Sequence, residues 1–199
     1  MASSTGSRLP VFVITGQSGA GKGTLIEQLL KRFPQLELAV SATTREQRPG
    51  EQEGVHYYFI SPAEFDRRLE RGEFLEHHDF PWGQRSGTLS SEIERIAAAG
   101  RVCVLELETQ GALAVAERVS EAVTIFVTAA IEELERRLRE RATESSGEIG
   151  ERLRVAREQL LVADRFDHVI ENDDLGRAVD ELEEIVARRL APAGTMARP

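Results

Sequence analysis

The stretch Val11 to Thr24, which reads VFVITGQSGAGKGT, constrains the fold of this chain more than any other. It opens with a short apolar, β-branched run that predicts one buried strand, and the apolar residues after it recur at helical spacing until Pro34. Between the two lie four glycines, with Lys22 among them. Glycines let backbone N–H groups approach a polyphosphate, the start of a helix adds positive charge, and a lysine serves the β- and γ-phosphates. A merely flexible turn would explain the glycines but not a lysine at this place.

The order of strand, glycine loop and helix therefore predicts a site for a nucleoside triphosphate. The spacing of Gly16, Gly21 and Lys22 fits the Walker A pattern, but Gly23 stands where that pattern has a hydroxyl residue, and Thr24 supplies the hydroxyl one position later. The residues expected to bind the triphosphate are Gly16, Gln17, Ser18, Gly19, Ala20, Gly21, Lys22, Gly23 and Thr24.

Length and charge restrict the class of protein. The chain has 199 residues, enough for one α/β domain with or without insertions, and a formal net charge of −9 that argues against nucleic acid or an anionic membrane as a partner. No apolar run approaches the roughly 20 residues that a membrane-spanning helix needs. The single cysteine, Cys103, lies in an apolar run and is expected to be a small buried hydrophobe. We therefore expect a cytoplasmic protein, with ATP and Mg²⁺ available to it.

Short apolar runs alternate with amphipathic segments, which predicts an α/β fold with a parallel sheet and crossover helices. Strands are expected at residues 11–15, 36–40, 55–60, 73–80, 101–108, 122–128 and 166–170. Helices are expected at residues 25–33, 62–71, 91–99, 110–119, 131–141, 151–164 and 175–190. Segments 81–90 and 143–150 are expected to be a loop and a hinge or mobile flap. The polar, strand-rich segment 41–88 interrupts the alternation, which predicts an insertion at the carboxyl edge of the sheet, where α/β proteins bind ligands.

A signature within this insertion points to a known family. It consists of Ser41-Ala42-Thr43-Thr44-Arg45, then Arg48, Gly50-Glu51, Gly54 and Tyr57-Tyr58-Phe59, and it is followed in order by Glu73-Phe74-Leu75-Glu76, Gln110-Gly111 and Asn172-Asp173-Asp174. In these residues the chain resembles the guanylate kinases, and the resemblance covers residues 11–190. The signature around Arg45 is specific, whereas many nucleotide enzymes share the phosphate loop.

The resemblance implies a three-layer P-loop NTPase core around a parallel sheet, with an inserted small mixed-sheet GMP-binding subdomain and a helical lid. The implied divisions are a core of residues 11–40, 89–138 and 157–190, a GMP-binding subdomain of residues 41–88 and a lid of residues 139–156. Residues 1–10 and 191–199 are expected to be a flexible leader and tail. The implied activity transfers the γ-phosphate of ATP to GMP or dGMP with Mg²⁺, giving ADP and GDP, in purine nucleotide metabolism.

The resemblance also implies a set of GMP-binding residues. They are Ser41, Arg45, Arg48, Tyr57, Glu76, Arg85, Thr88, Glu106 and Glu108. Arg45, Arg48 and Tyr57 would grip the GMP phosphate, because a planar guanidinium presents paired donors to phosphate oxygens. Glu76 would accept hydrogen bonds from guanine N1–H and N2–H, and Thr88 would reach O6. Adenine has an acceptor where guanine has N1–H, so Glu76 would be the specificity residue.

The residues implied for catalysis are Lys22, Arg45, Arg137, Arg141 and Arg152. Phosphoryl transfer depends on positioning and charge neutralisation, so arginines near the phosphate loop are the expected machinery. Arg137, Arg141 and Arg152 flank the lid and would close on the phosphates in transit, and Asn172 would lie at the adenine end of ATP. Because Gly23 has no hydroxyl, Mg²⁺ is expected to be held through water near Thr24 and Glu106.

One departure from the family pattern affects the GMP phosphate. The family usually has two tyrosines before the glycine and hydroxyl pair that contacts guanine, and this chain has Arg85 and Ser86 before the corresponding pair, Gly87 and Thr88. We hypothesise that Arg85 replaces the missing tyrosine hydroxyl as a phosphate contact.

Two other functions stay open at this point: a guanylate-kinase-like binding module without catalysis, and a related kinase of a phosphorylated sugar. The binding modules tend to lose the phosphate-loop lysine and the lid arginines, which this chain keeps. A sugar phosphate kinase has no use for Glu76 and Thr88. The expected partners are ATP and GMP or dGMP, with no nucleic acid and no membrane, and the chain is expected to be a monomer or a homodimer.

Overall fold

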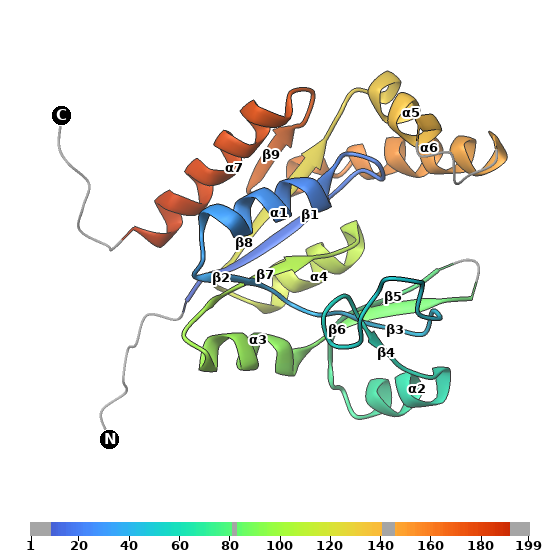
Figure 1. Cartoon of the computed structure of the whole chain (residues 1–199), viewed down its shortest axis with the longest axis vertical. Coiled ribbons are helices and arrows are strands. Elements are labelled where there is room, and N and C mark those ends of the chain that lie inside the picture. The colour runs from blue at the N-terminus through green and yellow to red at the C-terminus, as the bar shows by residue number, and fades with distance from the viewer. Residues whose placement is uncertain (1–8, 81–82, 141–145, 192–199) are drawn as a thin grey trace.

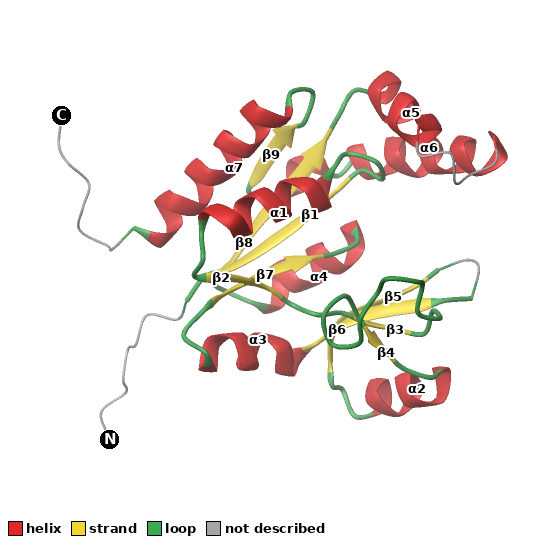
Figure 2. Ribbon diagram, viewed as in Figure 1, coloured by secondary structure: helices red, strands yellow, loops and turns green. Residues whose placement is uncertain are grey.

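The computed structural model of the chain describes residues 9–80, 83–140 and 146–191. It contains a five-stranded sheet and, beside it, a separate four-stranded sheet (Figures 1 and 2). The larger sheet has the order β2 (Leu36–Leu38), β7 (Val102–Glu106), β1 (Val11–Gly16), β8 (Ala122–Thr128) and β9 (His168–Glu171). All its neighbouring strands are parallel, so their carboxyl ends share one edge.

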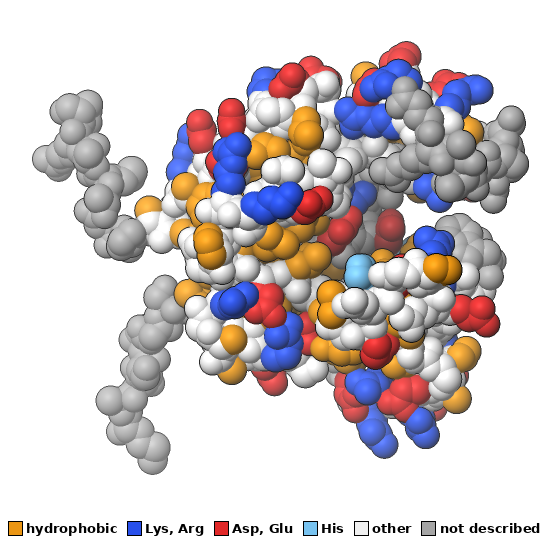
Figure 3. All heavy atoms as spheres, viewed as in Figure 1, with side chains coloured by type: hydrophobic (Ala, Val, Ile, Leu, Met, Phe, Trp, Pro, Cys, Tyr) orange, Lys and Arg blue, Asp and Glu red, His pale blue; other side chains and the backbone are white. Residues whose placement is uncertain are grey.

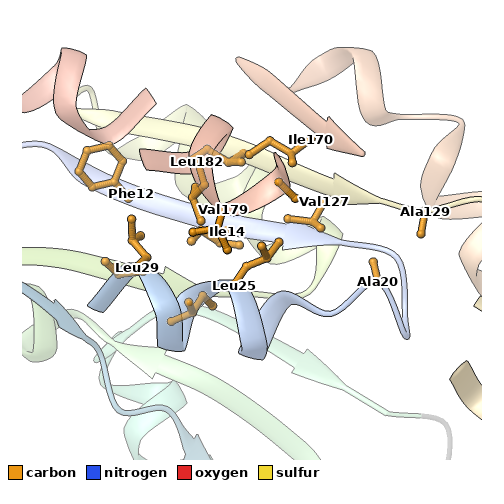
Figure 4. Packing of buried hydrophobic residues seen from close by; sticks show 14 of the residues in the cluster. Phe12, Ile14, Ala20, Leu25, Leu29, Val127, Ala129, Ile170, Val179 and Leu182 are labelled. Atoms are coloured by element: carbon orange, nitrogen blue, oxygen red, sulfur yellow. The ribbon is translucent and has the colours of Figure 1, made fainter. Parts of the chain in front are cut away.

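Helices cover both faces of this sheet. One face packs against α1 (Lys22–Arg32), α5 (Ile131–Glu140), α6 (Ser146–Leu160) and α7 (Leu175–Leu190), and the other against α3 (Ser90–Ala98) and α4 (Thr109–Arg118). Side chains alternate along β1, so Phe12 and Ile14 join the cluster with Leu25 of α1 and Leu182 of α7 (Figure 4). Val11 and Val13 join the cluster on the opposite face. A short 3₁₀ helix at Ala163–Arg165 precedes β9.

The smaller sheet is mixed. Its order is β4 (Tyr58–Phe59), β3 (Ala42–Thr43), β6 (Arg85–Leu89) and β5 (Phe74–Asp79), with only the pair of β3 and β4 parallel. Helix α2 (Pro62–Glu70) covers one face by stacking Phe65 on Phe74, with 4.4 Å between the ring centroids. The start of α2 follows from its sequence, because Ser61 caps the helix by accepting from the backbone N–H of Glu64. The remaining face looks toward the carboxyl edge of the larger sheet (Figure 1).

The expected α/β class and parallel sheet are confirmed, and the strand at 122–128 and the helix at 175–190 have the expected bounds. The loop expected at 81–90 is wrong, because residues 85–89 form β6 between β3 and β5. The strand expected at 55–60 is reduced to Tyr58–Phe59, after a turn at Gly54 with φ of 71°. The flap expected at 143–150 is wrong from Ser146 onward, since α6 begins there. Residues 1–8, 141–145 and 192–199, from the expected leader, lid and tail, lie outside the described residues.

Candidate active site

The phosphate loop follows β1 and ends at the first residue of α1. Lys22 is that first residue, and its Nζ donates to the carbonyl oxygens of Gly16 at 2.9 Å and Gln17 at 3.1 Å. The ammonium therefore lies over the loop, at the positive end of the helix. The sequence prediction of a strand, glycine loop and helix is confirmed here.

Two glycines of the loop are required by its conformation. Gly16 has φ of 138°, and a Cβ added there would lie 2.0 Å from the carbonyl oxygen of Val127. Gly21 has φ of 86°, and its Cβ would lie 2.6 Å from Nδ2 of Asn172. A side chain at either position would thus collide with a neighbouring element as well as strain the backbone.

Side-chain hydrogen bonds anchor this loop to the neighbouring elements. Gln17 is fully buried: its Oε1 accepts from the backbone N–H of Ala129 at 3.0 Å, and its Nε2 donates to the carbonyl of Ala156 in α6 at 3.0 Å. Asn172, directly after β9, donates to the carbonyl of Ala20 at 2.7 Å. Arg137 of α5 donates to the carbonyl of Asn172 at 2.8 Å. Gln17, Asn172 and Arg137 therefore hold the loop in place, a structural role that the glycine pattern did not predict for Gln17.

A cavity of about 380 Å³ lies in front of the loop, lined by Gly19, Gly21, Lys22, Gly23, Thr24, Glu27 and Glu106. Glu106 is the last residue of β7, so the parallel sheet brings its carboxylate opposite the lysine. Desolvation by the surrounding protein is the main cause of a raised pKa at Glu106. The positive charge of Lys22 lowers this pKa, and the negative charge of Glu108 raises it. Thr24 and Glu106, which the sequence analysis placed near the metal, therefore line one cavity together with Lys22.

Glu76 and Thr88 meet on neighbouring strands of the smaller sheet. They are paired in register on β5 and β6, and the backbone N–H of Thr88 donates to Glu76 Oε1 at 2.9 Å. The hydroxyl of Ser41 lies 3.5 Å from that of Thr88. Burial is the main cause of a raised pKa at Glu76, and the charge of Glu108 adds to it. The charge of Glu108 also adds to the raised pKa of Glu106.

Arg45 lies beside Glu51. Its two terminal nitrogens donate to the two carboxylate oxygens of Glu51 at 2.8 and 2.7 Å, and its guanidinium carbon lies 5.1 Å from the centre of the Tyr57 ring. The hydrogen bonds from Arg45 and from the backbone N–H of Arg48 hold the pKa of Glu51 at about 2. Of the three residues predicted as one group, Arg45 and Tyr57 are in contact, whereas Arg48 reaches Glu51 through its backbone N–H and has an exposed side chain. The sequence analysis missed the role of Glu51.

Arg85 is not brought to this group. Its guanidinium donates to Asp66 at 2.7 Å and lies over the Phe65 ring, on the face of the sheet that α2 covers. Thr88 lies on the opposite face, because residues three apart on a strand point in opposite directions. The hypothesis that Arg85 replaces the missing tyrosine hydroxyl is therefore wrong for this arrangement. Ser86 shares the face of Thr88.

Of the three arginines expected to flank the lid, the structure describes Arg137 and Arg152. Arg152 lies half-buried on α6, whereas Arg141 lies outside the described residues. Gln159, also on α6, accepts from the backbone N–H of Ser18 at 3.3 Å and donates to Glu108 at 3.5 Å. This helix therefore reaches both the phosphate loop and the acidic end of β7. Figure 3 shows the hollow between this part of the molecule and the smaller sheet, with acidic side chains at its base.

The described residues contain no group of three or more His, Cys, Asp or Glu side chains that could hold a metal by themselves. Within the same ranges, no helix has both the length and the apolar character needed to cross a membrane.

Comparison with known proteins identifies the family. A family model described as guanylate kinase matches residues 8–189. A guanylate kinase of Desulfitobacterium hafniense is 43% identical over 177 residues, covering 88% of each chain. One of Rubrobacter xylanophilus is 44% identical over 182 residues, covering 91% of this chain and 95% of the relative. The crystal structure of a guanylate kinase from Anaplasma phagocytophilum superposes with a TM-score of 0.71 at 28% identity, covering 92% of this chain and 87% of the other. The chain therefore belongs to the guanylate kinase family.

Proposed function

We propose that this chain transfers the γ-phosphate of ATP to GMP or dGMP, releasing ADP and GDP or dGDP. The observation that carries the proposal is the presence of two residue sets: Lys22, Thr24 and Glu106 line the cavity at the phosphate loop, and Glu76 and Thr88 pair on the smaller sheet, where the backbone N–H of Thr88 donates to the Glu76 carboxylate. A donor triphosphate and an acceptor nucleotide bound at these two ends would meet between them. The substrates make the cytoplasm the expected compartment.

The guanine ring is read by Glu76. The hydrogen bond from the backbone N–H of Thr88 orients the carboxylate, which then accepts from guanine N1–H and N2–H. Adenine offers an acceptor at N1 and would leave a buried carboxylate without a donor, which costs binding energy. The Thr88 hydroxyl donates to guanine O6, and Ser41 supports it from the side.

The GMP phosphate is gripped by Arg45, Arg48 and Tyr57. The guanidinium of Arg45 has five N–H donors. Three of them are used in hydrogen bonds, two to the carboxylate of Glu51 and one to the carbonyl oxygen of Glu46. These bonds hold the planar guanidinium in one orientation, so its remaining donors meet the phosphate without first having to be ordered. A bidentate, charge-assisted contact of this kind is stronger than a neutral hydrogen bond.

At the other end, Lys22 and the backbone N–H groups of the loop bind the triphosphate. The ammonium rests on the carbonyls of Gly16 and Gln17, within the cavity that the phosphates would enter. Arg137, Arg141 and Arg152 neutralise the charge that develops on the transferred group. Closure of the lid would exclude water, which otherwise competes with GMP for the γ-phosphate.

Mg²⁺ fits the residues near Thr24 and Glu106. This ion usually keeps several waters and takes one or two carboxylates together with substrate phosphates, so it does not need a cluster of protein ligands. Thr24 and Glu106 line the same cavity as Lys22, so a hydroxyl and a carboxylate are present where the phosphates would enter. When bound, Mg²⁺ would neutralise the phosphates of ATP.

The test is ADP production from ATP and Mg²⁺ with GMP, dGMP, AMP, CMP, UMP and ribose 5-phosphate as acceptors. Selective turnover of GMP and dGMP is expected. Turnover of ribose 5-phosphate alone would contradict the proposal and indicate a sugar phosphate kinase. GMP binding in calorimetry without turnover of any acceptor would indicate a binding module. Light scattering of the same sample would distinguish a monomer from a homodimer.

A further inference from the structure

Helix α4 passes unusually close to Glu76, and Gly111 is the residue at the point of contact. A Cβ added to Gly111 would lie 2.4 Å from Glu76 Oε2, 3.1 Å from its Cδ and 3.4 Å from its Cγ. Gly111 is buried in the first turn of α4, and Glu76 is 8% exposed on β5. Any residue other than glycine at position 111 would therefore occupy the space of the Glu76 carboxylate.

The backbone conformation of Gly111 does not require glycine. Its φ is not in the left-handed region, in contrast to Gly16, Gly19 and Gly21 of the phosphate loop. Within a helix, glycine is the least favourable residue after proline, so alanine would suit α4 better if conformation alone mattered. The close approach of Glu76 therefore explains why position 111 is a glycine.

The atom that a new Cβ would displace is the one that binding needs. Glu76 Oε1 is held by the backbone N–H of Thr88 at 2.9 Å, and Oε2 lies against Gly111. Pushing Oε2 away would turn the carboxylate about its bond to Thr88, so its two oxygens would no longer face N1–H and N2–H of one guanine. The end of a glutamate side chain is flexible, so the fold would tolerate this shift although recognition would not.

We propose that Gly111 is a positioning residue for guanine specificity: by leaving room against α4, it sets the direction of the Glu76 carboxylate. This inference rests on the proposed function, in which Glu76 reads guanine. It predicts that alanine at position 111 separates two properties, preserving or raising stability while impairing the choice of purine.

The first variant is Gly111→Ala, tested with GMP and with IMP, which has N1–H and O6 but no N2 amine. We expect the GMP KM to rise about tenfold or more, the size of effect for one lost hydrogen bond to a charged group. We expect the ratio of kcat/KM for GMP over IMP to fall, the ATP KM to stay the same, and the thermal midpoint not to decrease. Gly176→Ala in α7 is the matched control, since its Cβ would approach only Oδ1 of Asp174, at 3.3 Å, and should leave the GMP KM unchanged.

The second step removes the carboxylate. In a Glu76→Ala background the new methyl group has room, so adding Gly111→Ala should not change kcat/KM for GMP and should raise the thermal midpoint. The inference is overturned if Gly111→Ala lowers kcat/KM for GMP by the same factor in both backgrounds. It is also overturned if a GMP-selective wild-type enzyme keeps its GMP KM and its GMP-to-IMP ratio after Gly111→Ala. A wild-type chain that ignores GMP would instead overturn the proposed function.

Discussion

Replacing Glu92 by alanine tests how the smaller sheet is attached to the core. Glu92 lies on α3, and its side chain is only 4% exposed. Its carboxylate accepts from the backbone N–H of Val40 at 2.9 Å and from the hydroxyl of Tyr58 at 3.0 Å. Arg95 donates to both of its oxygens, at 2.9 and 3.0 Å. Val40 leads into the smaller sheet and Tyr58 belongs to it, so this one carboxylate fastens the sheet to a core helix.

The expected cost is about 2–4 kcal/mol of unfolding free energy. Leaving the N–H of Val40 without its acceptor costs about 1–3 kcal/mol, and losing the Tyr58 bond adds about 1 kcal/mol. Arg95 is 45% exposed, so water can take the place of its partner and we assign its loss little weight. Burial raises the pKa of Glu92, but the hydrogen bonds from Arg95, Val40 and Tyr58 outweigh it and leave the pKa below its usual value.

The measurement is urea unfolding of the wild type, Glu92→Ala and the control Glu94→Ala, an exposed glutamate on the same helix. Because its pKa is lowered on folding, ionised Glu92 stabilises the fold above the pKa of an unfolded glutamate, and this contribution is lost as pH falls through the folded value. The difference between wild type and Glu92→Ala should therefore narrow at acid pH. An equal loss for both variants at neutral pH would refute the reasoning.

Three further predictions concern single groups. Lys22→Ala should lower kcat by at least about 100-fold, as for loss of other transition-state charge contacts, with GMP affinity in calorimetry unchanged. As the pH is lowered, the GMP KM should begin to rise at a higher pH than it would with a glutamate of ordinary pKa, because burial raises the pKa of Glu76. Glu76→Gln should flatten this pH profile of the KM. Burial raises the pKa of Cys103 to about 12, so its thiol should react with a disulfide reagent only after unfolding in urea.

The sequence was sufficient for the parts of the fold that local chemistry determines. The phosphate loop was predictable because its glycines and Lys22 are all set by one local turn, and the buried strands were predictable because they are continuous apolar runs. The start of α2 was likewise readable, since Ser61 and Glu64 lie within one helical turn.

Strand β6 could not be predicted in the same way. Its residues Arg85 to Leu89 begin with polar side chains and a glycine, and they become a strand because β3 and β5 supply partners on both sides. Missing the strand caused the error at Arg85: a loop lets any side chain turn toward the phosphate, but a strand sends Arg85 and Thr88 to opposite faces. The roles of Glu92 and Gly111 were missed for a related reason: Val40 and Tyr58, which bond to Glu92, lie 52 and 34 residues away in the sequence, and the Glu76 side chain beside Gly111 belongs to the smaller sheet.

Four carboxylates discussed above differ in the direction of their pKa shift. Glu51 and Glu92 have lowered values, because arginines and backbone N–H groups donate to them, and they fix parts of the fold. Glu76 on the smaller sheet and Glu106 at the phosphate-loop cavity have raised pKa values, because desolvation disfavours their ionised form. A raised pKa means that the folded chain bears a cost for each ionised carboxylate, which guanine N–H donors at Glu76 or a cation at Glu106 would relieve on binding. The excess negative charge is thus compatible with binding phosphates, because guanine N–H donors would stabilise the ionised Glu76 and a metal ion would offset the charge of Glu106.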